Sequence, residues 1–227
     1  MQLIASGERL KDHITKNKLD TILPIEVINA CELCVYKKDE SVLTANTTMH
    51  YYYFFCTGKL KIFQFHENGR AFLIQFYTAF DALGEIELMT DMDATCSVTA
   101  IQESELIRIP MAIMKRYATE YPEFLRYVIK ALSMKLLIAD SHHASNLLNP
   151  VLNRLASYLK AHNNEQQTFV LSESLQEISD YIGTTYRQLH RAFSRLEEEG
   201  IIERDNKKIL VRNQEQLSKY AGNIYRI

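Results

Sequence analysis

The amino-acid sequence predicts an α+β chain with an N-terminal β-roll, a long central helix and a C-terminal module of helices with a small sheet. Short segments rich in β-branched and aromatic residues occupy much of the first half of the 227 residues. Residues 123–140 contain neither glycine nor proline, which favours one long helix. Beyond Pro150, two helical apolar patterns flank Gly183. We therefore expect three parts, at residues 1–110, 111–148 and 149–227.

The N-terminal part is predicted to contain many short strands after a loosely helical start that ends near Ile28. Within Lys59–Phe65, polar and apolar residues alternate as in a half-buried strand. The pair Asn68-Gly69 predicts a tight hairpin turn, because both residues tolerate positive φ. Short strands with regular turns are typical of a roll, barrel or sandwich. The expected strand segments are 34–43, 51–65, 71–77, 97–101 and 105–109, and the turn-like groups Lys37–Glu40 and Thr57-Gly58 break up the first two.

The long helix is predicted to begin at Pro122, which suits a first helical turn. The group Ser141–Asn146, ahead of Pro150, indicates its end and a hinge. Apolar residues recur on more than one face, so we expect two packing partners, the β-part and the same helix of a second subunit. A helix buried within a monomer is the alternative. The predicted dimer stripe consists of Leu125, Val128, Leu132, Leu136 and Ala139.

The C-terminal module is predicted to contain a helix-turn-helix between Ser172 and Arg212. Ser174 and Glu177 have the spacing of a capping box, in which each side chain bonds the other residue's backbone N–H. Gly183 is expected to end the first helix because it adopts positive φ at little cost. A second helix follows after Thr184-Thr185, and residues 200–212 suggest a strand, a turn and a strand.

The second helix has an exposed basic face, which points to nucleic acid. From Thr184 to Leu196 there are three arginines and no acidic residue. A helix-turn-helix places such a helix in the major groove, where arginine pairs with guanine or phosphate. From Pro150 onward the sequence has 11 Lys or Arg and 10 Asp or Glu, so this part is nearly neutral. Specific DNA binding would therefore depend on where the basic side chains lie rather than on net charge. A winged helix that contacts protein instead of DNA is the alternative.

Whole-chain properties narrow the class of protein. The formal net charge of −2 gives no overall signature of nucleic-acid binding. The sequence lacks a P-loop, a Rossmann glycine pattern and the HExxH and GxSxG motifs, so we do not expect an enzyme. No run approaches the ~18 apolar residues that span a bilayer, and the N-terminus lacks signal-peptide features. We expect a cytoplasmic protein with reduced thiols and no membrane partner.

Three stretches resemble the Crp/Fnr family of transcription regulators. Residues 83–89 (Leu-Gly-Glu-Ile-Glu-Leu-Met) are similar to the Gly-Glu-Leu segment of the family's phosphate-binding cassette. Residues 181–202 resemble its turn and recognition helix, and residues 206–211 its wing. The segments Gly-Glu-Ile-Glu-Leu and Tyr-Arg-Gln-Leu further suggest the YeiL-like branch of this family. The resemblance covers nearly the whole chain and is weakest before residue 30.

The resemblance implies a cyclic-nucleotide-binding-like jelly roll that senses a signal, a dimerising helix, and two recognition helices on a near-palindromic double-stranded DNA operator. It also implies contact with RNA polymerase if the protein is an activator. The base-reading candidates are Tyr186, Arg187 and Arg191. The candidates for the DNA backbone are Thr185, Arg195 and Lys207.

The resemblance argues against cyclic AMP as the effector. Family members that bind it carry an Arg-Ser or Arg-Thr pair about ten residues beyond Gly-Glu-Leu, whereas Ala94-Thr95 stands here. A buried phosphate without a cation carries a large desolvation cost. The remaining pocket candidates are Gly84, Glu85, Ile86 and Thr95, for an effector other than cyclic AMP or for none.

Four cysteines lie in the first half of the chain and form the other candidate sensor. By the resemblance, an iron–sulfur cluster is conceivable, and thiolates also bind zinc. The family's tight N-terminal cysteine spacing is missing, and buried cysteine often acts as a small apolar residue. A metal site, a redox thiol and a structural role are thus open for Cys31, Cys34, Cys56 and Cys96.

Overall fold

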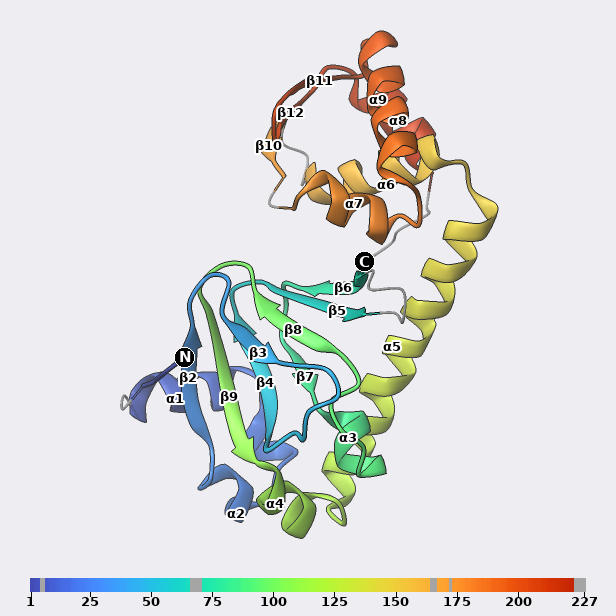
Figure 1. Cartoon of the computed structure of the whole chain (residues 1–227). Helices are drawn as coiled ribbons and strands as arrows, with labels where there is room; N and C mark the ends of the chain where they lie inside the picture. Colours follow the sequence, from blue (N-terminus) through green and yellow to red (C-terminus); the bar gives the residue numbers. More distant parts are fainter. Residues whose placement is uncertain (5–6, 66–70, 164–166, 172, 223–227) are drawn as a thin grey trace. The chain divides into compact units, whose positions relative to one another are not determined.

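A computed structural model describes residues 1–4, 7–65, 71–163, 167–171 and 173–222 (Figure 1). The chain forms two compact units, Met1–Lys135 and Leu136–Ile227, which are described separately. The predicted Asn68-Gly69 turn and the predicted first residue of the helix-turn-helix, Ser172, lie outside the described residues.

The first unit is a roll of two antiparallel sheets. One sheet has the strand order β1-β2-β9-β4-β7 and the other β3-β8-β5-β6. The strands are β1 (Gln2–Leu3), β2 (Glu32–Tyr36), β3 (Ser41–Leu43), β4 (Tyr51–Thr57), β5 (Leu60–Phe65), β6 (Ala71–Tyr77), β7 (Asp81–Leu83), β8 (Ser97–Ala100) and β9 (Ser104–Pro110).

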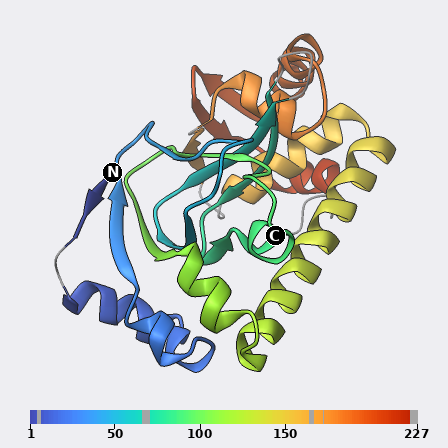
Figure 2. The same ribbon diagram turned by 60° about the horizontal axis from the view of Figure 1, so that its bottom comes forward.

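Short helices border the roll. They are α1 (Gly7–Lys16), the 3-10 turn η1 (Leu19–Thr21), α2 (Ile25–Ile28), α3 (Glu85–Thr90), α4 (Met111–Ile113) and the π-helical turn η2 (Met114–Ala118). Helices α1 and α2 lie on the same side of the roll as α4 in both views (Figures 1 and 2). Strands β1 and β7 and helix α3 were not predicted: β1 pairs with β2, β7 pairs with β4, and α3 follows β7.

Aromatic residues of β4 form the centre of the roll's core. Tyr52, Phe54 and Phe55 are fully buried. The Tyr52 ring lies 5.2 Å from that of Phe54 and 5.9 Å from that of Phe124 on the long helix. Because β4 is covered on both faces, its sequence is continuously apolar, whereas β5 is more alternating. This packing attaches the start of the long helix to the roll.

The long helix α5 (Pro122–Leu148) begins as predicted, but it does not end at Ser141–Asn146. It continues to Leu148 and stops ahead of Pro150, which has no N–H to continue the helical bonding. The helix runs two residues past the Ser141–Asn146 group, to residue 148 where the expected helical part ends, because serine and histidine lower helix propensity by only tenths of a kcal/mol. Side-chain contacts in the second unit, described below, add to the stability of this last part.

The second unit is a winged helix-turn-helix with a core of its own. Its elements are α6 (Val151–Asn163), β10 (Thr168–Val170), α7 (Leu175–Tyr181), α8 (Tyr186–Glu198), β11 (Ile202–Asp205), β12 (Lys208–Val211) and α9 (Gln214–Ala221). The sheet order is β10-β12-β11, and the strands are antiparallel. Leu155, Phe193 and Leu217 are fully buried in a core that joins α6, α8 and α9.

Candidate functional site

The first helix of the helix-turn-helix begins with the predicted capping box. The Glu177 backbone N–H donates to Ser174 Oγ over 3.2 Å, and the Ser174 N–H donates to Glu177 Oε2 over 2.8 Å. These bonds satisfy N–H groups that have no partner in the first helical turn. The start of α7 is therefore set by local sequence.

The turn between α7 and α8 depends on Gly183 and on a buried arginine. Gly183 has a φ of +63°, and a Cβ there would lie 3.0 Å from Asn146 Nδ2 and 3.2 Å from Arg154 Nη1. The Arg154 guanidinium, from α6, donates to the carbonyls of Ile182 and, over 3.1 Å, Gly183. Arg154 is only 6% exposed. Sequence reasoning found the glycine but missed the arginine, which looks like an ordinary helix residue.

Helix α8 is amphipathic in the predicted register. Thr185 is its N-cap, and its Oγ1 accepts from the Gln188 N–H over 3.3 Å. The inward side chains are Leu189, Ala192, Phe193 and Leu196. The exposed side chains include Tyr186, Arg187, Arg191, Ser194 and Arg195.

The three arginines of α8 differ in their surroundings. In the part of the chain that the structure describes, neither Arg187 nor Arg191 forms a hydrogen bond or an ion pair through its side chain. Arg195 Nε donates to Glu199 Oε1 over 2.9 Å, and Tyr220 Oη donates to Glu199 Oε2 over 2.8 Å. The bonds from Arg195 and Tyr220 lower the pKa of Glu199, so its carboxylate stays charged. Arg187 and Arg191 are thus the free cations of this face.

The wing is the hairpin of β11 and β12. Asp205 and Lys208 are partners in the ladder, so Asn206 and Lys207 form a two-residue turn. Asn206 has a φ of +52°, a conformation that asparagine tolerates. Both Lys207 and Lys208 are exposed, while the Lys207 carbonyl accepts from Leu171 N–H over 2.8 Å. The wing therefore presents two lysine side chains on an ordered backbone.

The predicted pocket residues of the roll do not line one empty site. Gly84 and Glu85 are buried, whereas the Ile86 side chain is 44% exposed. Thr95 donates from both N–H and Oγ1 to Glu87 Oε1, each over 2.8 Å. Glu85 instead contacts Lys135 of α5, whose Nζ lies 2.7 Å from Glu85 Oε1. Sequence reasoning missed Lys135, a lone lysine between Met134 and Leu136.

The predicted dimer stripe divides between two environments. Val128 is buried in the roll's own core, and Leu125 and Leu132 are partly buried. Leu136 is 62% exposed, and Ala139 is exposed as well. Further exposed apolar side chains on the helix include Ile129 and Leu137, at 65% and 62%. Helical spacing alone does not reveal which apolar residues the roll covers.

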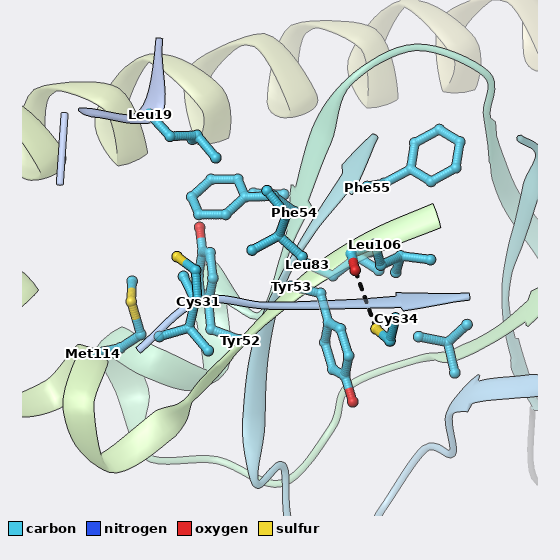
Figure 3. Packing of buried hydrophobic residues seen from close by; sticks show 14 of the residues in the cluster. Leu19, Cys31, Cys34, Tyr52, Tyr53, Phe54, Phe55, Leu83, Leu106 and Met114 are labelled. Carbon is cyan, nitrogen blue, oxygen red and sulfur yellow. Dashed lines mark hydrogen bonds between the residues drawn. The ribbon is translucent and has the colours of Figure 1, made fainter. Parts of the chain in front are cut away.

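The four cysteines do not fit a metal centre. The Cys34 thiol donates to the Leu106 carbonyl over 3.1 Å inside the apolar core (Figure 3), and the Cys31 thiol donates to the Val27 carbonyl. Burial raises the pKa of Cys31, Cys34 and Cys56 to about 12 and that of Cys96 to about 11. Among the described residues, no three His, Cys, Asp or Glu side chains gather around a possible ion.

No helix within the described ranges is both long enough and apolar enough to cross a membrane.

Comparison with known proteins relates both units to described families. Residues 33–121 match the cyclic nucleotide-binding domain, and residues 153–220 match the Crp-like helix-turn-helix domain. The chain is 27% identical over 169 residues to Regulatory protein YeiL of Escherichia coli, covering 74% of this chain and 76% of that protein. It is 22% identical over 173 residues to Transcriptional activator protein Anr of Pseudomonas protegens, covering 73% and 70%.

Solved structures share the fold. FixK2 from Bradyrhizobium japonicum has a TM-score of 0.69 at 21% identity, covering 84% of this chain and 96% of that one. A putative Crp/Fnr transcriptional regulator from Eubacterium rectale has a TM-score of 0.78 at 16% identity, covering 91% and 96%. The order of roll, long helix and winged helix-turn-helix agrees with both.

Proposed function

Since this chain belongs to the Crp/Fnr family of transcription regulators, we propose that it binds a near-palindromic operator as a homodimer. Two recognition helices would enter successive major grooves, which mirrors the twofold symmetry of such a site. An activating role is supported by the likeness to Transcriptional activator protein Anr, and in that role the protein would contact RNA polymerase. The signal would be an effector other than cyclic AMP, or none.

The free arginines of α8 carry this proposal. Arg187 and Arg191 are four residues apart, so they share one face of the helix near its N-terminus. With Tyr186 they are our candidates to read base edges. Thr185 and Lys207 would contact the DNA backbone. Arg195 would join them by exchanging Glu199 for a phosphate.

The exposed apolar face of α5 supports the homodimer. Ile129 and Leu136 are seven residues apart and lie on the same face, with Leu137 beside them. Such side chains remain in contact with water in a monomer, and packing two copies of the helix would bury them. We therefore assign the dimer contact to Ile129, Leu136 and Leu137, and Val128 to the roll.

Selection of bound duplexes from a random pool by the full-length protein tests the DNA proposal. Arg187→Ala and Arg191→Ala should each lose about 1–3 kcal/mol on the selected site and relax its base preference. Lys207→Ala should weaken binding to all duplexes alike and reduce the salt slope by about 1. Arg126→Ala, an exposed arginine on α5, is the matched control.

The same selection experiment can also refute the proposal of operator binding. A protein that enriches no sequence and whose duplex binding ignores salt would use its winged helix for protein contacts instead. If Arg187→Ala and Arg191→Ala both bound the selected site like the parent, these side chains would not be the base readers.

A further inference from the structure

A lysine from the long helix, with its side chain 25% exposed, reaches the roll at the segment between β7 and α3. Lys135 Nζ lies 2.7 Å from Glu85 Oε1, 2.8 Å from the Ala82 carbonyl oxygen and 3.2 Å from Asp81 Oδ1. All three acceptors belong to the segment that runs from β7 into α3. The contact joins residues 50 positions apart in the sequence. A single ammonium group therefore ties α5 to this segment.

The surroundings keep this lysine charged. Burial by itself lowers the pKa of Lys135, but Tyr77, Glu85 and Asp81 together raise it above its usual value. The ammonium also lies 5.3 Å from the centre of the Tyr77 ring, a cation–π distance. The Glu85 side chain is only 4% exposed, so Lys135 is the cation that compensates a buried carboxylate.

The charge balance disfavours an anionic ligand here. Two carboxylates face one ammonium, so the group carries a formal charge of −1. A phosphate would have to take Lys135 from Glu85 and leave that carboxylate buried beside another anion, which is costly. The neighbouring Glu87 is already held by Thr95. The ligand chemistry that fits these acceptors is an alkylammonium ion, and the chain supplies one itself.

We propose that Lys135 is a built-in ligand of the roll, whose ammonium group fills the site formed by Asp81, Ala82 and Glu85 and ties α5 to the roll without a diffusible effector. Operator binding that needs no small molecule is the consequence, and this consequence rests on the proposed function. The tie itself is a property of the first unit and is testable without DNA.

Replacement of the lysine and return of its missing atoms test the proposal. Lys135→Ala should lower the Tm of the full-length protein by roughly 5–10 °C, because it leaves Glu85 buried without its cation. The control Lys130→Ala, at an exposed position of the same helix, should leave the Tm unchanged. Millimolar n-propylammonium, which carries the atoms that Lys135→Ala removes, should restore part of the Tm of that variant alone.

A second variant keeps the test decisive if Lys135→Ala does not fold. Glu85→Gln keeps the size of the side chain and an acceptor for Lys135 but removes the negative charge. Its Tm should therefore fall less than that of Lys135→Ala. The double variant Glu85→Gln/Lys135→Ala should be no less stable than Lys135→Ala and should not respond to n-propylammonium. If Lys135→Ala melted like Lys130→Ala, or if n-propylammonium raised the Tm of all variants equally, the built-in ligand would be refuted.

Duplex binding separates this inference from the proposed function. Wild-type protein should bind its selected duplex without additions, and cyclic AMP should change the affinity by less than about twofold, against about 5–150-fold for typical allosteric coupling. Binding that appeared only with a cyclic nucleotide would overturn the inference. A protein with amine rescue of Tm but no duplex binding would refute the proposed function alone.

Discussion

At the residue scale, Arg154 holds the turn on which the recognition helix depends. Its guanidinium donates to two consecutive carbonyls at the end of α7, Ile182 and Gly183. Backbone carbonyls at a helix end have no partner within the helix, so a buried turn must supply donors. Gly183 provides the conformation, and Arg154 provides the donors. Both Gly183 and Arg154 are needed to account for the conformation of the turn between α7 and α8.

Arg154→Met should therefore destabilise the second unit and weaken duplex binding. We expect a loss of about 2–4 kcal/mol in the free energy of unfolding, since the buried Ile182 carbonyl and the partly buried Gly183 carbonyl lose a charged donor. Urea unfolding followed by circular dichroism at 222 nm measures it. Arg126→Met, which removes an exposed arginine of α5, should cost less than about 0.5 kcal/mol. Equal midpoints for the two variants would contradict the role given to Arg154.

His142, on the C-terminal part of α5, makes the second unit sensitive to pH. Its ring centre lies 4.5 Å from that of Tyr181. Burial, followed by the charges of His143 and Arg154, lowers the pKa of His142 from 6.5 to about 4. The folded state therefore holds a neutral ring at pH values where the unfolded chain takes up a proton. The stability that results is present above pH 6.5 and is lost as the pH falls toward 4.

Unfolding measured at a series of pH values checks this linkage. The wild-type protein should lose more stability than His142→Phe between pH 6.5 and 4.5, because the variant has no ring to protonate. His143→Phe, at the exposed neighbouring position, should follow the wild-type curve. Parallel curves for wild type and His142→Phe would show that His142 is not the responsible group.

The cysteines provide a further test at this scale. Because burial raises the pKa of all four thiols, they stay protonated and weakly nucleophilic near neutral pH. Native protein at pH 7.5 should react with iodoacetamide far more slowly than guanidinium-unfolded protein, as read by mass spectrometry. Rapid labelling of any one cysteine in the native protein would support a redox role for that residue. Iron in protein purified without oxygen would support an iron–sulfur cluster.

At the scale of elements, α5 combines two apolar faces with different partners. Phe124 and Val128 pack into the roll, whereas Ile129, Leu136 and Leu137 remain exposed. A helix with apolar residues all round is one that is covered all round. The roll supplies part of that cover. A second copy of the helix would supply the rest.

Leu136→Glu should consequently shift the protein toward monomer. A charge in the helix–helix contact would be desolvated without a partner, so we expect the dimer dissociation constant to rise by about tenfold or more. Ile138→Glu is the matched control, because Ile138 is 44% exposed but lies about 100° or more around the helix from Ile129, Leu136 and Leu137. Sedimentation velocity distinguishes the two. Identical dimers for both variants would place the subunit contact elsewhere.

At the scale of the whole molecule, much of the fold could be predicted from the sequence. Strand periodicity, capping residues and glycine turns each involve only a few neighbouring residues. They can therefore be recognised in the sequence without a structure. The capping box of Ser174 and Glu177 and the inward face of α8 were confirmed for this reason. The long helix was confirmed at its start, and it continues two residues beyond the Ser141–Asn146 end signal, where a contact distant in sequence adds to its stability.

The candidate sites were predictable to different degrees. Arg187 and Arg191 were identifiable because an amphipathic helix exposes its polar residues wherever it packs. The pairing of Lys135 with Glu85 was not identifiable from the sequence. The long side chain of a lysine in an apolar helix can extend into water as readily as it can extend to a carboxylate. Which of the two it does depends on how α5 packs against the roll.

The sequence by itself thus determined the order of roll, helix and winged helix-turn-helix, the turn at Gly183 and the arginines of α8. Only the tertiary structure decided which face of α5 the roll covers, which arginine supports the turn, and which cation pairs with the buried Glu85. The reason is physical: local patterns depend on backbone geometry repeated every two or 3.6 residues. The partners of buried charged groups, whether a backbone carbonyl or a carboxylate, are brought together by the fold across 28 or 50 positions.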